Sequence, residues 1–151
     1  MLVVADTSPF DYLVWIEAEH IQPPLYSKIV IPREVRAELL APDAPPAVRC
    51  WARNLSAWVE VCAPDPALLD DRRWRSLDLG RRAALALATI RQPAVLLIDE
   101  RAGATIARSQ GFTVVGTLGV LDEAARHGLI SLPEAIDHLK RTSFRYPTGG
   151  G

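Results

Sequence analysis

The sequence predicts an α/β fold in which a parallel central sheet of four to five strands carries helices on both faces. Two short apolar runs, at residues 2–5 and 94–98, are each followed directly by a helix start, which is typical of buried strands. Strands and helices alternate along the chain, which is the pattern of parallel sheets. With 151 residues, 49% of them hydrophobic, the chain is long enough for one domain with a substantial core.

Prolines divide the first half of the chain and restrict where its elements begin and end. Pro9 suits the first turn of one helix, and Pro32 starts another. Residues 41–46 form a proline-rich linker, and Pro64 and Pro66 interrupt the chain again. The predicted elements of this half are strand 2–5, helix 8–17, loop 22–24, strand 28–31, helix 32–40, helix 47–55 and strand 58–61.

An alanine-rich helix over residues 77–90 opens the second half. Its face of small residues, which includes Ala83, Ala84 and Ala88, allows close packing against a sheet. The remaining predicted elements are strand 94–98, helix 101–109, a turn at Gly111, strand 112–115, a helix from 116 to 127 that Gly128 caps, and helix 133–141. Residues 148–151 are expected to form a flexible, glycine-rich tail.

Net charge, hydrophobic runs and cysteines indicate which partners the protein binds and in which cellular compartment it lies. A net charge of −1 argues against strong non-specific nucleic-acid binding by the whole surface, although it leaves room for a local basic groove. No apolar run reaches the roughly 18 residues of a membrane span, and no signal peptide is visible. Cys50 and Cys62 have no partners at metal-binding spacing, and we expect both to be buried, reduced thiols. Together these observations predict a cytoplasmic protein.

Acidic residues follow both of the apolar runs. Asp6 ends the first run, and Asp99 and Glu100 end the second, at the strand ends where open α/β sheets place their ligands. Glu38 shares one face of its predicted helix with Glu34. A single such acid is more often solvated or ion-paired, and Asp99 could simply cap the next helix. Clustered carboxylates, however, repel one another unless a cation such as Mg²⁺ or Mn²⁺ neutralises them.

Four stretches of the chain resemble the PIN-domain nucleases, in particular their VapC-like toxin branch. They are VADTSP at residues 4–9, IPREVRAEL at 31–39, LIDER at 97–101 and GTLGVLDEAARHGLI at 116–130. Each motif is short, but the set covers nearly the whole chain in the expected order. The resemblance implies a single PIN-like domain over residues 1–147 that acts as a metal-dependent endoribonuclease, in which a metal-activated water hydrolyses a phosphodiester.

The resemblance also assigns roles to particular residues. It implies that Asp6, Glu38 and Asp99 are catalytic and that Asp6 and Asp99 bind Mg²⁺ or Mn²⁺. A hydroxyl from Thr7 or Ser8 would assist and contact the RNA. Glu100 is a further candidate for the metal site. The implied partners are an RNA substrate, a small antitoxin protein and, in a homodimer, a second copy of the chain.

The sequence departs from the family pattern at the start of the alanine-rich helix. The family pattern Leu-Asp-x-Gly-Glu-x-Glu-Ala is replaced by LDLGRRAA, so that Arg81 and Ala83 stand where glutamates are expected. Basic residues in the first helical turn cost about 0.3–1 kcal/mol each. One hypothesis is that Arg81 turns into the acidic pocket and pairs with Asp6 or Asp99 in place of a metal. A second is that Asp78 supplies the missing acid, against the alternative that it only caps the helix.

These departures leave an alternative function open. A catalytically degenerate PIN domain would keep RNA or protein binding as a regulatory module. The segment DDRRWR at residues 70–75 could serve either function, because Arg72, Arg73 and Arg75 could track phosphates while Trp74 stacks on a base. The competing interpretation is an exposed charged loop with Trp74 in the core.

Overall fold

Five parallel strands form one sheet, in the order β3-β2-β1-β4-β5. The structure is a computed structural model that describes residues 2–15, 28–55, 57–99 and 101–141. Its strands are β1 (Leu2–Ala5), β2 (Lys28–Pro32), β3 (Val59–Cys62), β4 (Val95–Leu97) and β5 (Val114–Val115). β1 lies at the centre, with Val3 opposite both Ile29 of β2 and Val95 of β4. The predicted α/β class and parallel sheet are confirmed.

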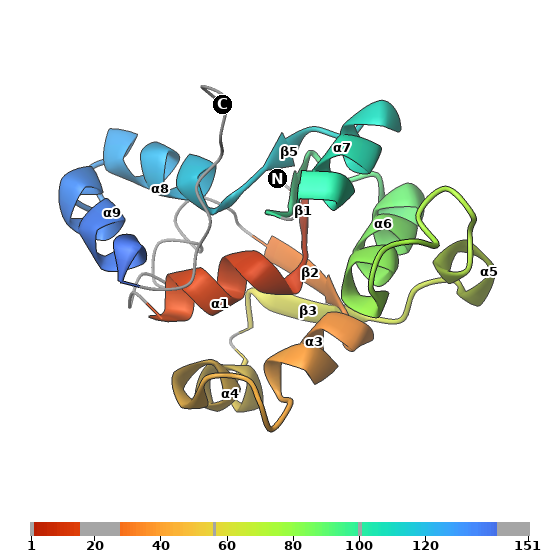
Figure 1. The fold of residues 1–151 in the computed structure, drawn as a ribbon, viewed down its shortest axis with the longest axis horizontal. Coiled ribbons are helices and arrows are strands. Elements are labelled where there is room, and N and C mark those ends of the chain that lie inside the picture. Colours follow the sequence, from red (N-terminus) through yellow and green to blue (C-terminus); the bar gives the residue numbers. More distant parts are fainter. Residues whose placement is uncertain (1, 16–27, 56, 100, 142–151) are drawn as a thin grey trace.

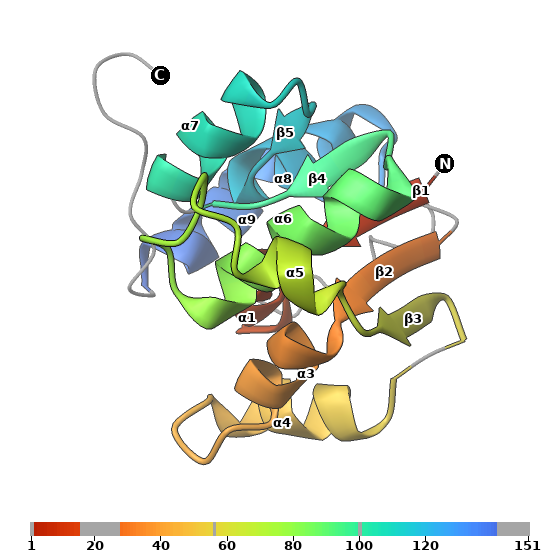
Figure 2. The same ribbon diagram turned by 90° about the vertical axis from the view of Figure 1, so that its right-hand side faces the viewer.

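Helices cover both faces of this sheet, as Figures 1 and 2 show. They are α1 (Thr7–Trp15), α3 (Arg33–Leu39), α4 (Pro46–Arg53), α5 (Pro66–Leu69), α6 (Leu79–Arg91), α7 (Arg101–Ser109), α8 (Thr117–Arg126) and α9 (Leu132–Lys140). α1, α8 and α9 lie on the left of the sheet in Figure 1, and α6 and α7 lie on its right.

The two faces of the sheet have separate cores because successive side chains of a strand point to opposite faces. Val3 packs on one face with Phe10 of α1 and with buried residues of α3, α4, α8 and α9. Val4 packs on the other face with Leu85 of α6, with α7 and with the buried Trp74. Burial on both faces explains why β1 reads as a continuous apolar run.

The predicted elements agree with the observed ones to within a few residues, with α5 as an exception. Pro66 stands in the first turn of α5, and the Asp65 carboxylate accepts a hydrogen bond from Ala67 N at 2.9 Å. The prediction that the prolines only interrupt the chain there was therefore wrong, because proline is tolerated at a helix start. The predicted loop 22–24, the end of the first predicted helix and the tail 148–151 lie outside the described residues.

The cysteines, two glycines and the lengths of the helices bear on three further expectations. Cys50 is exposed and Cys62 is half-buried, so the prediction of two buried thiols was wrong. Gly111 and Gly128 have φ angles of 89° and 72°, which confirms the turn predicted at Gly111 and the left-handed helix cap predicted at Gly128. Across the described ranges, no helix combines the length and apolar character that a membrane span requires.

Candidate functional site

Asp6 and Asp99 lie at the carboxyl ends of the two neighbouring strands β1 and β4. The chain leaves β1 toward β2 on one side of it, and β4 pairs with β1 on the other side. In open α/β sheets such a switch point is the usual place for a ligand. The backbone N–H of Asp6 donates to Leu97 O at 2.9 Å, and Asp99 follows Leu97 by two residues. The sheet therefore brings both predicted acids to one edge.

The Asp6 carboxylate is buried, with only 1% of the residue exposed. Burial raises its pKa from 3.8 to about 7, although the backbone N–H of Thr7 and the charge of Arg81 lower it, while Glu38 and Asp78 raise it. Within the described part of the chain, its Oδ2 atom has no hydrogen-bond partner. A buried carboxylate oxygen without a donor is costly. Asp6 is therefore the acid that most needs a cation.

Asp99 is held by the start of α8. Its Oδ1 accepts a hydrogen bond from Thr117 N at 2.5 Å, and its Oδ2 accepts one from the Thr117 hydroxyl. Burial raises the pKa of Asp99, while the hydrogen bonds from Thr117 and the charge of Arg81 lower it. Gly116 makes this approach possible, because a Cβ atom there would lie 2.5 Å from Asp99 Oδ1. Asp99 thus provides an acceptor for the first backbone N–H of α8, the N–H of Thr117, which lies 18 residues further along the chain.

Glu38 reaches the same edge from α3. Its Oε2 accepts a hydrogen bond of 2.5 Å from the hydroxyl of Thr7, the residue next to Asp6. Its carboxylate also packs over Gly80 of α6, where an added Cβ would lie 2.6 Å from Oε2. The charge of Glu38 raises the pKa of Asp6, so the two carboxylates are electrostatically coupled. The structure therefore brings three of the predicted residues together here: Asp6, Thr7 and Glu38.

Asp11 joins this group and was not predicted from the sequence. It lies on α1 four residues after Thr7, on the same helix face, and burial together with the charge of Glu38 raises its pKa to about 6. The spacing of four between Thr7 and Asp11 is the signal that could have identified it. A cavity of about 320 Å³ opens beside these groups. It is lined by Thr7, Asp11, Glu38, Ala41, Asp43, Ala44 and Pro45.

Arg81 enters the acidic group from the first turn of α6. Asp78 is the N-cap of α6 and accepts a hydrogen bond from Arg81 N at 3.2 Å, so the capping interpretation of Asp78 is confirmed. The Asp78 carboxylate also binds Nη1 of Arg81, and Nε of Arg81 lies 3.7 Å from Asp6 Oδ2. The hypothesis that Arg81 pairs with Asp6 is therefore confirmed in its geometry. Ser8 lies half-buried in α1, and Glu100 lies outside the described residues.

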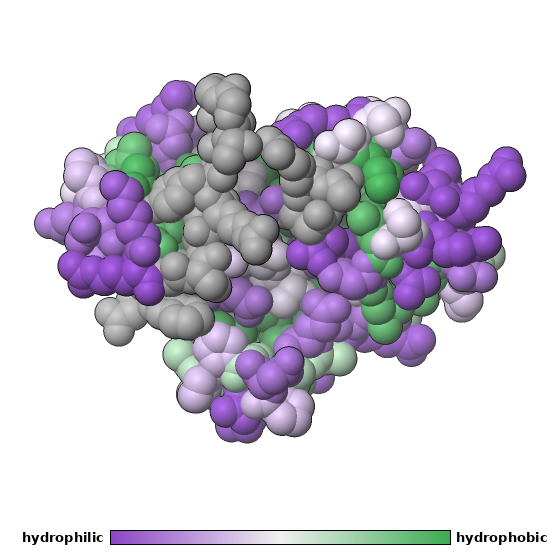
Figure 3. All heavy atoms as spheres, in the orientation of Figure 1, coloured by the Kyte–Doolittle hydropathy of each residue, from purple (hydrophilic) through white to green (hydrophobic). Residues whose placement is uncertain are grey.

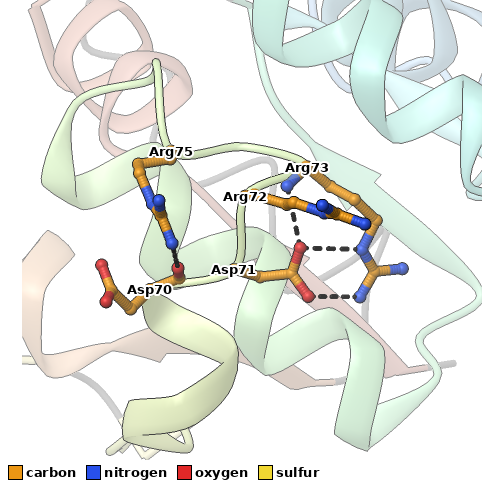
Figure 4. Close-up of a pocket in the computed structure, with 5 residues that line it drawn as sticks. All are labelled: Asp70, Asp71, Arg72, Arg73 and Arg75. Atoms are coloured by element: carbon orange, nitrogen blue, oxygen red, sulfur yellow. Dashed lines mark hydrogen bonds and ion pairs between the residues drawn. The ribbon is translucent and has the colours of Figure 1, made fainter.

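The arginines predicted to contact RNA lie in the loop between α5 and α6. Figure 3 shows hydrophilic residues gathered over this loop, at the right of the molecule. Arg73 binds Asp71 at 3.0 Å and also donates to Gln110, while Arg75 donates to the backbone oxygen of Asp70 (Figure 4). A cavity of about 460 Å³ lies against the loop. It is lined by Asp70, Asp71, Arg72, Arg73 and Arg75.

Trp74 takes no part in that surface. Its side chain is fully buried, and its indole N–H donates to Leu68 O at 2.9 Å. The guanidinium of Arg73 covers its ring at 4.4 Å from the ring centroid. The expectation that Trp74 stacks on a base was therefore wrong, and the competing interpretation of a charged loop anchored by a core tryptophan is confirmed.

The acidic residues can be tested for their fit to a divalent ion. Within the described ranges, no group of three or more His, Cys, Asp or Glu side chains could hold a metal ion. The chemistry of the donors nevertheless fits Mg²⁺ or Mn²⁺, because they are carboxylates and Oδ2 of Asp6 lacks a hydrogen-bond donor. The two oxygens of Asp99 already accept bonds from Thr117. Oδ2 of Asp6 is therefore the oxygen without a donor, while each oxygen of Asp99 keeps one further lone pair for a metal ion.

The sheet order and the acids at its switch point define an α/β domain with an acidic site at the carboxyl ends of β1 and β4. The chain matches the DUF3368 family, described as a PIN domain, over residues 2–149, and it belongs to this family. PIN domains are in general dependent on divalent metals. Neither the curated proteins nor the solved structures contain a match to the chain.

Proposed function

We propose that this protein is a metal-dependent endoribonuclease that hydrolyses phosphodiester bonds at Asp6. The observation that carries the proposal is the buried Asp6 carboxylate at the switch point of the sheet, whose Oδ2 has no hydrogen-bond partner in the described part of the chain. A cation would supply the missing interaction. The PIN family to which the chain belongs supports the nuclease class.

The roles of the residues follow from their contacts. Asp6 and Asp99 would hold Mg²⁺ or Mn²⁺, which when bound supplies an activated water and an anchor for phosphate. The bond from Asp6 N to Leu97 O fixes one acid on the sheet, and Thr117 orients the other. Thr7 holds the carboxylate of Glu38 beside Asp6, so that Glu38 can accept a proton from the attacking water.

The substrate and partner belong to the same proposal. Ser8 lies next to Thr7 in the first turn of α1, where backbone N–H groups and the hydroxyl can meet a phosphate. Exposed arginines of the 70–75 loop would contact the RNA backbone. The resemblance to VapC-like toxins adds a small antitoxin protein and a homodimer as the expected partners.

A second candidate function is a PIN domain that binds RNA or a protein without hydrolysis. The specific observation that favours it is the ion pair between Arg81 and Asp6, at a position where the family pattern has a glutamate. Ala83, at the other expected glutamate, is fully buried and carries no ligand atom. Under this alternative the same surface engages RNA, but no cleavage follows.

The experiment that separates the two functions is a calorimetric titration of Mn²⁺ into the wild type and Asp6→Asn. Under the nuclease proposal the wild type binds Mn²⁺ and Asp6→Asn does not. The matched control is Asp137→Asn, an exposed acid of α9 that pairs with Arg141. Absence of Mn²⁺ binding in all three proteins would favour the non-hydrolytic alternative. Cleavage of single-stranded RNA, with and without EDTA, then tests the activity itself.

A further inference from the structure

Taken together, Asp6 and Asp99 are influenced by more negative than positive neighbouring charges. Glu38 and Asp78 raise the pKa of Asp6 through their negative charges, while Arg81 is the cation whose charge lowers the pKa of both Asp6 and Asp99. Within the described part of the chain, Arg81 is thus the arginine whose charge acts on both acids. A position between carboxylates is also where a divalent ion would be most stable.

The geometry fixes the guanidinium in that position. One side of it binds Asp78, the N-cap three residues earlier, and Nε faces Asp6 Oδ2 at 3.7 Å. The side chain of Arg81 is 22% exposed and that of Asp6 is 2% exposed. An ion pair so far removed from water is much less screened than one at the surface. The attraction to these acids can also offset the unfavourable placement of a cation in the first turn of α6.

We propose that Arg81 is a resident cation of the Asp6–Asp99 site, which neutralises Asp6 in the absence of metal and competes with a divalent ion for that carboxylate. The competition rests on the proposed metal-dependent function, whereas the coupling between Arg81 and Asp6 does not. When a metal ion binds Asp6, the guanidinium of Arg81 leaves Asp6 but keeps its ion pair with Asp78. The metal ion then replaces Arg81 as the cation beside Asp6. Arg81 thereby lowers the affinity of the site for metal.

The coupling is tested without metal, by unfolding in EDTA. The variants are Asp6→Asn, Arg81→Gln and the double variant, with Arg82→Gln in both backgrounds as the control from the same helical turn. We expect the loss of unfolding midpoint caused by Arg81→Gln to fall by about half or more when Asp6 is already Asn. Arg81→Lys, which keeps the charge, should retain part of the coupling if Arg81→Gln fails to fold. Equal losses in both backgrounds would overturn the proposal.

The competition is tested by calorimetry with Mn²⁺ alone. We expect Arg81→Gln to bind Mn²⁺ about tenfold more tightly than the wild type, and Arg82→Gln, with the same change of charge, to bind within about threefold of it. Equal or weaker binding by Arg81→Gln than by Arg82→Gln would overturn the competition. If no protein binds Mn²⁺, the metal-dependent function and the competition both fail. The EDTA experiment alone then decides whether Arg81 is the resident cation.

Discussion

At the scale of single residues, two opposing influences act on the Asp6 carboxylate. Burial disfavours its charge, whereas the backbone N–H of Thr7 and the guanidinium of Arg81 favour it, and burial prevails because the pKa rises from 3.8 to about 7. A folded state with the higher pKa binds the proton more tightly than the unfolded chain. The charge on Asp6 therefore costs stability, even though the proposed metal site requires it.

This imbalance predicts that Asp6→Asn increases stability in alkaline solution. The destabilisation by ionised Asp6 is absent below pH 3.8, grows as the pH rises and is complete above a pH of about 7. The free energy of unfolding of Asp6→Asn should exceed that of the wild type at pH 8 by on the order of a few kcal/mol. The excess should disappear toward pH 4, as measured by urea unfolding. An excess that does not change with pH, or one shared by Asp137→Asn, would contradict the prediction.

Asp99, unlike Asp6, has a hydrogen-bond donor for each carboxylate oxygen. Both donors belong to Thr117, through its backbone N–H and its hydroxyl. Thr117→Val preserves the shape of the fully buried side chain but removes the hydroxyl. We expect a loss of about 1–3 kcal/mol in the free energy of unfolding, since the lost bond is made to a charged group. Thr89→Val is the control, because its hydroxyl donates only to Leu85 O in its own helix. Equal losses in the two variants would exclude a special role for the Thr117 hydroxyl.

The sequence predicted Asp6 and Asp99 because each follows a strand at the edge where parallel strands end, whereas Glu38, on the helix after β2, was predicted from the resemblance to PIN-domain nucleases. It did not predict the bond between Asp99 and Thr117, because no local pattern shows that one helix is capped by a residue 18 positions earlier. The same limit explains Trp74. Its neighbours in the chain are arginines, and only tertiary packing shows that the ring is buried beneath one of them.

At the scale of elements, the site depends on how closely α3 and α6 approach. The carboxylate of Glu38 lies over Gly80, in space that any larger residue would need. Glycine at the start of a helix otherwise costs stability through the entropy of the unfolded chain. Gly80 is therefore explained by the approach of Glu38 rather than by the requirements of α6 itself.

This contact predicts that Gly80→Ala has opposite effects on the free energy of unfolding in the wild type and in Glu38→Ala. In the wild type, Gly80→Ala should lower the free energy of unfolding, because its Cβ would meet the Glu38 carboxylate and displace it from Thr7. In Glu38→Ala the obstacle is gone, and the same change should add about 0.4–1 kcal/mol. Urea unfolding of the four proteins gives the comparison. A destabilising Gly80→Ala in both backgrounds would show that some other contact requires glycine.

Element boundaries were predictable where residues have strong local preferences. Pro32, Asp78 and Gly128 mark helix ends in the sequence and in the structure. α5 was missed because a helix of four residues has no periodic apolar face, and the prolines around it indicate a break more strongly than a start. From the sequence alone the position of the Arg81 side chain is only a hypothesis, because the direction of a side chain depends on the charges that tertiary structure brings to it.

At the scale of the whole molecule, one segment joins an arginine-rich loop to the acidic site. The loop before α6 carries Arg72, Arg73 and Arg75, and the segment ends at the acidic site with Asp78 and Arg81. Arg73 and Arg75 make hydrogen bonds within the loop or to Gln110. A phosphate contact by Arg72 would break none of those bonds, so Arg72 is the best test of an RNA path along this segment.

We predict that Arg72→Ala weakens the binding of single-stranded RNA through electrostatics alone. Loss of one phosphate contact should reduce the slope of log affinity against log salt by about 0.7, independently of base sequence. Fluorescence anisotropy of a labelled random-sequence RNA across a salt series measures both quantities, with EDTA present to prevent cleavage. Arg126→Ala, on the exposed surface of α8, is the control for net charge. Since Arg72 lies outside the acidic group, calorimetry with Mn²⁺ should give the same affinity as in the wild type. A slope equal to that of Arg126→Ala would place the RNA elsewhere on the molecule.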